Sequence, residues 1–150
     1  MNSVKSRFDC FALALDFGAP QVSQIRESLS LLLPRLGELV ASFDAALKRD
    51  VAGRLFPGLE GEQRERLQSL IASFILRTIN CNFDDAFCEF AAEVSGAADI
   101  PPGFFAFGLS MAQDFVCGAL PSVQRDPTKL AEMLTAWNRL IAALKEITRK

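Results

Sequence analysis

The sequence predicts an all-α fold, and three observations lead to this prediction. Apolar residues recur at steps of three and four along every long segment, which is the spacing of one helix face. No segment alternates apolar and polar residues over a useful length, as a half-buried strand would. Proline and glycine mostly fall between the periodic segments and divide the chain into separate helices. The 150 residues suffice for a buried core, and we expect a single domain over residues 1–150.

Two helical segments are expected in the first third of the chain. The first covers residues 4–15 and ends at Gly18. The second covers residues 21–48, and Pro34 should kink it or divide it in two, because proline lacks an amide hydrogen and its ring crowds the preceding turn. Residues 50–61 are rich in glycine and form a turn-rich connection with room for one helical turn.

Two phenylalanine-rich helices are expected to meet at a proline corner. Asn82 suits the N-cap of the first, so this helix should start near Phe83. It should fail around residues 95–99, because glycine weakens it and the residue before a proline avoids helical angles. Pro101 and Pro102 suit the first turn of the second helix.

One long helix is expected before this corner and one after it. The earlier helix covers residues 62–80. A connector over residues 119–125 leads to the later helix, which Asp126 and Pro127 start as N-cap and first turn. The later helix carries two apolar rows, more than one side of a core normally needs: Leu130, Leu134, Trp137, Ile141 and Leu144, with Met133, Leu140 and Ile147 beside them.

Composition excludes several classes of site. The chain has no histidine, which removes the commonest general base and metal ligand. No nucleophile, base and orienting group occur at a recognisable spacing, so we expect neither an enzyme nor a metal site. The formal charge of −2 offers no basic stripe for nucleic acid. Arg77 and Asp114 interrupt the two most apolar stretches, and no secretory signal is recognisable, so a cytoplasmic protein with reduced cysteines is expected.

Residues 93–101, which read EVSGAADIP, carry a resemblance to a known family. They resemble a segment of bacterial globin-coupled sensors that reads Glu-Val-His, three residues, then glycine, an aliphatic residue and proline. The resemblance extends from about Arg7 to Lys145, because the leading helix, the run RESLSLLLPRLGELVASFDAALKRD and the run RLQSLIASFILRTI follow the family's order and approximate spacing. It implies a globin-like fold with an extra N-terminal helix.

The chain departs from this family at both residues that serve heme. Ser95 stands where the family has the histidine that ligates heme iron. Phe43 and Asp44 stand where the family usually has Phe-Tyr, whose tyrosine hydroxyl reaches the iron-bound gas. Some relatives of the sensor globins keep the fold without heme, among them stressosome proteins and sporulation-inhibiting sensors, and the latter hold fatty acids. The chain resembles these heme-free members.

The resemblance implies a non-enzymatic sensing domain. A small apolar ligand, such as a fatty acid, would shift helix packing and so signal to a partner protein. The implied pocket consists of Phe43, Asp44, Leu67, Leu70, Ile71, Phe74, Arg77, Phe87, Ala91, Val94, Ser95, Phe104 and Phe107. Ser95 or Arg77 would meet the ligand's carboxylate. The plainer alternatives are that Ser95 ends a helix, that Asp44 faces water and that the phenylalanines form an ordinary core.

The resemblance also implies a homodimer, because the family's last two helices pair across a dimer. The expected interface residues are Leu130, Met133, Trp137, Leu140 and Ile147. The alternative is that the wide last helix faces the core throughout. A second function stays open as well: an oxygen-sensing heme protein with an unusual axial ligand, such as the thiolate of Cys88 or Cys117.

Overall fold

The fold is all-α, as predicted. The computed structural model describes residues 3–49, 54–56, 61–80 and 83–149, and these residues contain no strand. The helices are α1 (Val4–Ala14), α2 (Ala19–Leu32), the 3₁₀ helix η1 (Leu33–Arg35), α3 (Leu36–Leu47), α5 (Gly61–Asn80), α6 (Asp85–Gly96), α7 (Phe104–Val123) and α8 (Pro127–Ile147).

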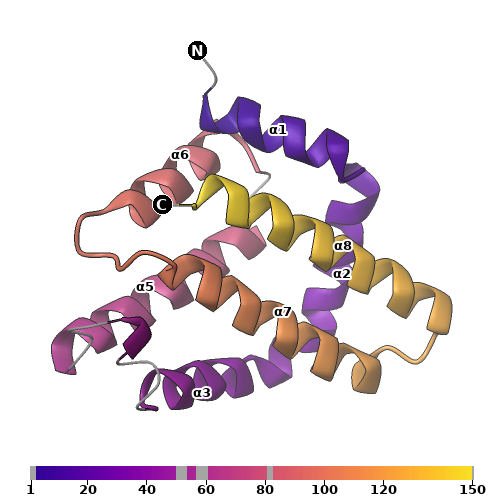
Figure 1. Cartoon of the computed structure of the whole chain (residues 1–150). Coiled ribbons are helices and arrows are strands. Elements are labelled where there is room, and N and C mark those ends of the chain that lie inside the picture. Colours follow the sequence, from indigo (N-terminus) through magenta and orange to yellow (C-terminus); the bar gives the residue numbers. More distant parts are fainter. Residues whose placement is uncertain (1–2, 50–53, 57–60, 81–82, 150) are drawn as a thin grey trace.

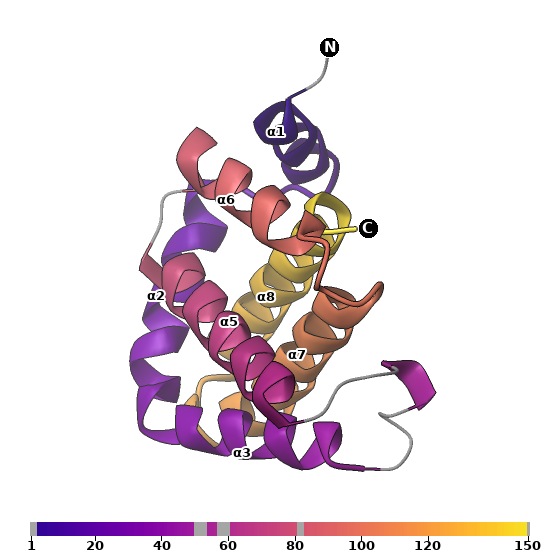
Figure 2. The same ribbon diagram turned by 90° about the vertical axis from the view of Figure 1, so that its left-hand side faces the viewer.

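The predicted break at Pro34 is confirmed. Pro34 lies in η1, which separates α2 from α3. Proline cannot donate an amide hydrogen bond in the interior of a helix, so the chain tightens into a 3₁₀ turn at this point. The break lets α3 leave the direction of α2, and both figures show α3 crossing one end of the molecule (Figures 1 and 2).

Two predicted helix starts have different outcomes. Asp126 caps α8 as expected, since its Oδ1 accepts hydrogen bonds from the amides of Thr128 at 2.9 Å and Lys129 at 3.3 Å. The start near Phe83 is wrong. Asp84 is the N-cap of α6, and Phe83 has a φ of 56°, which no helical residue has. The predicted cap Asn82 lies outside the described residues.

The limits of α7 also differ from the prediction. The two prolines at 101 and 102 precede the helix, and the N-cap is Gly103 with a φ of 81°, a conformation that glycine adopts without steric cost. At the other end, α7 continues to Val123 with Pro121 inside it, so residues 119–123 are not a connector. Pro121 stands in the last turns of the helix, where losing one amide donor does not end it.

Helices α7 and α8 run side by side and form the centre of the fold (Figure 1). Helix α8 also packs against α2, α1 and α6, while α3 packs against α7 and α5. Figure 2 shows α1 and α6 at one end of the molecule and α3 at the other. Helix α8 therefore has neighbours on several sides.

This surrounding explains the wide apolar face of α8. Met133, Leu140 and Ile147 are at most 2% exposed within the chain itself. The expectation that a second copy covers these three side chains is wrong, because helices of the same chain already bury them. Of the five expected interface residues, only Leu130 and Trp137 are partly exposed.

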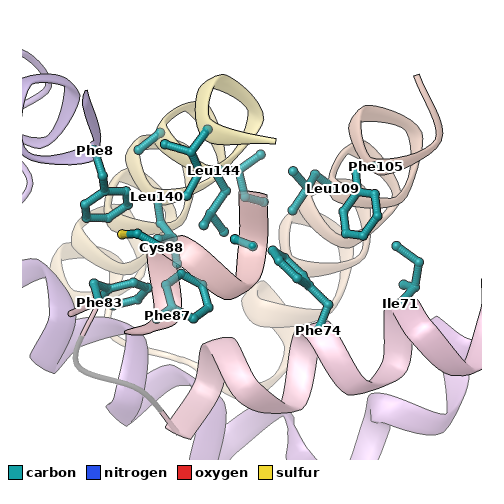
Figure 3. Packing of buried hydrophobic residues seen from close by; sticks show 14 of the residues in the cluster. Phe8, Ile71, Phe74, Phe83, Phe87, Cys88, Phe105, Leu109, Leu140 and Leu144 are labelled. Carbon is teal, nitrogen blue, oxygen red and sulfur yellow. The ribbon is translucent and has the colours of Figure 1, made fainter. Parts of the chain in front are cut away.

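The main core joins α1, α2, α3, α5, α6, α7 and α8. Figure 3 shows Phe8, Phe87, Cys88 and Leu140 gathered between α1, α6 and α8. A smaller cluster, which includes Leu32, Val116, Ala119, Leu120 and Met133, packs α2 and α7 against α8.

Helix α7 is long and apolar enough to cross a membrane by length and composition alone. It is the one such helix within the part of the chain that the structure describes, and 44% of its most apolar stretch is buried in the molecule. A core helix of a folded domain has the same properties, and α7 packs against α2, α3 and α8.

Candidate ligand site

Phenylalanine rings fill the space in which the sequence predicted a pocket. Phe74 of α5 lies 6.1 Å from Phe87 and 5.2 Å from Phe105, measured between ring centroids. On the other side, the rings of Phe43 and Phe104 are 5.8 Å apart. Most of these contacts are tilted or edge-to-face, which aromatic pairs prefer. Figure 3 shows Phe74 directed toward Phe105 and Leu109 of α7.

Phe56 completes this filling, although the sequence analysis placed it in a turn-rich connection. Its ring centroid lies 5.6 Å from those of Phe104 and Phe107, and the side chain is 3% exposed. The signal in the sequence was one phenylalanine among a few aliphatic residues and several glycines. Such a residue has no periodicity of its own, so its burial could not be predicted from spacing.

The other residues of the predicted pocket separate into three groups. Leu67, Phe87, Ala91 and Phe104 are almost completely buried in the core, while Leu70 and Val94 are half-buried at its edge. Arg77 is exposed, with its guanidinium 4.0 Å above the ring centroid of Phe90. Ser95 is buried and donates a hydrogen bond to the carbonyl of Ala92 at 3.2 Å, away from the Phe74 cluster.

Three of the predicted residues, Phe43, Asp44 and Ile71, line a recess between α3, α5 and α7. We call it the α3–α5 recess. Its volume is about 310 Å³. Its lining consists of Gly37, Leu39, Val40, Ala41, Phe43, Asp44, Gln68, Ile71, Ala72, Ile75 and Gly108.

The floor of the recess depends on a glycine of α7. A Cβ atom built on Gly108 would lie 3.1 Å from Cδ1 of Ile71 and 3.7 Å from Cε2 of Phe43. The first distance is shorter than ordinary van der Waals contact, so the absence of a side chain lets α7 approach α5 and α3 closely. The floor is therefore apolar and shaped by backbone as well as by side chains.

The rim of the recess is polar. Asp44 accepts a hydrogen bond from the amide of Gln68 and forms an ion pair with Lys48, whose Nζ lies 2.7 Å from Oδ2. The hydrogen bond from Lys48, and next the one from Gln68, lower the pKa of Asp44 below its ordinary value. Asp44 is thus half-exposed, ionised and paired. It lines the recess, as the predicted pocket required, and it also faces water, as the plainer alternative held.

A small apolar cavity of about 50 Å³ adjoins the recess. The two share Leu39 and Ile75, and Phe74 and Leu109 line the cavity from the core side. Its wall is almost entirely apolar and consists of residues of α2, α3, α5, α7 and α8. Leu39 and Ile75 therefore separate the recess from this smaller apolar hollow.

The sequence missed eight of the eleven residues that line the recess. Leu39 and Val40 belong to the apolar pattern of residues 21–48, and Ile75 belongs to that of residues 62–80, so their apolar character was visible. Val40 is 59% exposed, so it lies at the open side of the recess that it lines. Gln68 is on the polar side of its helix, and its role appears only when α3 is placed beside α5.

None of the three cysteines within the described residues lines the recess. Cys88 is completely buried in the core, whereas Cys10 and Cys117 are exposed, and Cys81 lies outside the described residues. Within residues 3–49, 54–56, 61–80 and 83–149, no three His, Cys, Asp or Glu side chains gather as a metal site requires.

Comparisons of this chain with protein-family models, curated proteins and solved structures give no match. The resemblance to sensor globins thus keeps the standing of an expectation.

Proposed function

We propose that this chain is a non-enzymatic, heme-free sensing domain of globin-like type, whose ligand is a small apolar molecule, such as a fatty acid, held in the α3–α5 recess. The proposal is supported by two observations together: an apolar recess, and phenylalanine rings in the space where the resemblance to sensor globins would put a heme. Phe43, Ile71 and Gly108 form the floor of the recess. The neighbouring space, which a heme would need, is occupied by the rings of Phe74 and Phe104.

The size of the recess restricts the ligand. Ligand pockets in proteins range over roughly 300–1,000 Å³, so a volume of about 310 Å³ suits a slender chain or a small ring. A slender chain also fits the direction of the small cavity behind Leu39 and Ile75, into which its end could reach. Each methylene buried there contributes about 0.8 kcal/mol.

The rim supports an amphipathic ligand rather than a hydrocarbon. Lys48 can meet a carboxylate, and Gln68 can meet a carboxylate or a hydroxyl. Asp44 repels a carboxylate that comes too close, so a fatty acid would have to leave its head group beside Lys48 in water. A fatty alcohol has no such repulsion and could donate a hydrogen bond to Asp44.

Ligand binding in the recess could also change how the surrounding helices pack. A guest in it contacts α3, α5 and α7 together, so its binding energy favours the arrangement of these helices that leaves the recess open. A partner protein that contacts the outer face of α3 would respond to this arrangement. The partner itself is unspecified.

Binding can be tested with dodecanoate and dodecanol as probes. Both should raise the melting temperature of the purified protein in a concentration-dependent way, because each binds the folded state only. Native mass spectrometry of the protein as purified should show whether a lipid accompanies it.

A pair of α3 variants places the site. Ala41 is exposed and lines the recess, whereas Ala45, one turn later, is exposed and does not line it. Ala41→Phe should lay a ring across the recess and weaken probe binding at least tenfold, while Ala45→Phe should leave it unchanged. Equal probe binding by both variants would contradict the proposal. So would a melting temperature that fatty acids and fatty alcohols of every chain length leave unchanged.

A further inference from the structure

A second pocket lies between the corner that joins α6 to α7 and the last turns of α8. Its volume is about 280 Å³. Its walls are mainly apolar and include Ile100, Pro101, Phe105 and Ala142. We call it the α8 pocket, and it shares no lining residue with the α3–α5 recess.

Most polar side chains of the α8 pocket already have partners within the chain. The buried hydroxyls of Ser95 and Thr148 donate to the carbonyls of Ala92 and Leu144. The carboxylate of Glu146 pairs with the guanidinium of Arg149 at 3.3 Å. These groups therefore hold the pocket's shape and leave little hydrogen-bonding capacity of their own.

Lys145 is the exception. It lines the pocket and is half-buried, yet its ammonium has no ion-pair or hydrogen-bond partner among residues 3–49, 54–56, 61–80 and 83–149. An anion in the pocket would give this ammonium the partner that the described part of the chain does not supply. The unpaired cation thus sets the sign of a ligand's charge.

The backbone adds two donors beside this cation. Phe105 and Ala106 lie in the first turn of α7 and line the pocket, and their amides have no acceptor in the described structure. The N-cap is Gly103, which brings no side-chain acceptor. These amides and the positive end of the helix dipole act in the same direction as the ammonium of Lys145.

We propose that the α8 pocket binds a small monocarboxylate with an apolar body. Its carboxylate lies between Lys145 and the amides of Phe105 and Ala106, and its apolar part lies against Ile100, Phe105 and Ala142. A phosphate would satisfy the donors but would leave this apolar wall uncovered. The inference is independent of the ligand proposed for the α3–α5 recess.

Hexanoate is a suitable probe. Hexanol is the control that lacks the charge, and inorganic phosphate is the control that lacks the apolar body. In amide-resolved NMR of the full chain, hexanoate should shift the signals of Phe105 and Ala106 in a saturable way. Hexanol and phosphate should bind at least tenfold more weakly. Equal shifts with hexanol would overturn the role of the charge, and equal shifts with phosphate would overturn that of the apolar wall.

Two variants test the cation and the space separately. Lys145→Met should weaken hexanoate at least tenfold, whereas Lys129→Met, at the far end of the same helix, should not change it. Ala142→Glu should abolish binding by placing a carboxylate in the pocket, and the exposed position of Ala142 makes the variant compatible with folding. Ala41→Phe in the recess should leave these shifts intact. Wild-type binding by Lys145→Met would refute the proposal.

Discussion

Replacing Phe74 by alanine tests whether aromatic packing really fills the predicted heme position. Phe74 is 1% exposed, and its ring meets those of Phe87, Phe90 and Phe105 at centroid distances of 6.1, 6.4 and 5.2 Å. Truncating a buried phenylalanine costs about 3–5 kcal/mol, because apolar contacts are lost and a cavity remains. We expect Phe74→Ala near the upper end of this range, since four helices adjoin the site.

The assay is unfolding by urea and by heat. In a chain of this size each kcal/mol moves the melting temperature by roughly 2–4 °C, so Phe74→Ala should melt about 6–20 °C below the wild type. Phe11→Ala is the matched control, because Phe11 is 36% exposed on α1 and should cost less than about 1 kcal/mol.

A second measurement separates a cavity from a general loosening. The new void would adjoin the existing cavity of about 50 Å³ that Phe74 lines, and a dry apolar void of this kind can take up a small aromatic guest. Benzene should therefore restore part of the lost stability of Phe74→Ala and leave Phe11→Ala unchanged. A cost below about 1 kcal/mol for Phe74→Ala would refute the packing argument.

Three further predictions follow from the same structure. Because Lys48 and Gln68 lower the pKa of Asp44, its contribution to stability is present above its ordinary pKa of 3.8 and is lost as the pH falls through the lowered value. Urea titrations should accordingly show Asp44→Asn less stable than the wild type at pH 7 and equal to it in strong acid; a constant difference would contradict this. Leu140→Asp should cost about 4 kcal/mol or more and should unfold much of the protein rather than yield a folded monomer, as circular dichroism will show. Reconstitution with hemin should give no stoichiometric Soret band, and a one-to-one complex whose band vanishes in a Cys88 or Cys117 variant would establish the heme alternative.

The sequence was most informative where a local cause determines the structure. Pro34 cannot continue a helix, and Asp126 followed by proline is a strong start, so both features were predictable from a few residues. Asp84 was overlooked as a cap because Asn82 precedes it and is equally good in isolation. The choice between them depends on Phe83, whose ring stacks on that of Phe8 at 5.6 Å, a contact between distant parts of the chain.

The sequence was least informative about which helix faces pack against each other. Periodicity identified both apolar rows of α8 but not how many helices surround it, so Met133, Leu140 and Ile147 were assigned to a partner. The same limit applies to Ser95. Its place near a glycine and a proline was visible, but only the path of α8 shows that it lines a pocket with Lys145 rather than the space beside Phe74.

The position of the recess follows from how the phenylalanines are distributed. The rings of Phe74, Phe87 and Phe105 join α5, α6 and α7 tightly, so the space between these helices is closed to a ligand. Gly108 draws α7 toward α5, and α3 crosses both helices at their outer side. The apolar space that remains is therefore the α3–α5 recess, which lies further from the phenylalanine cluster. The ligand proposed for the recess would contact α3 together with α5 and α7, and α3 packs against both of these helices. For this reason a signal in this chain should leave through α3, and Ala41→Phe should alter partner binding even when no ligand is present.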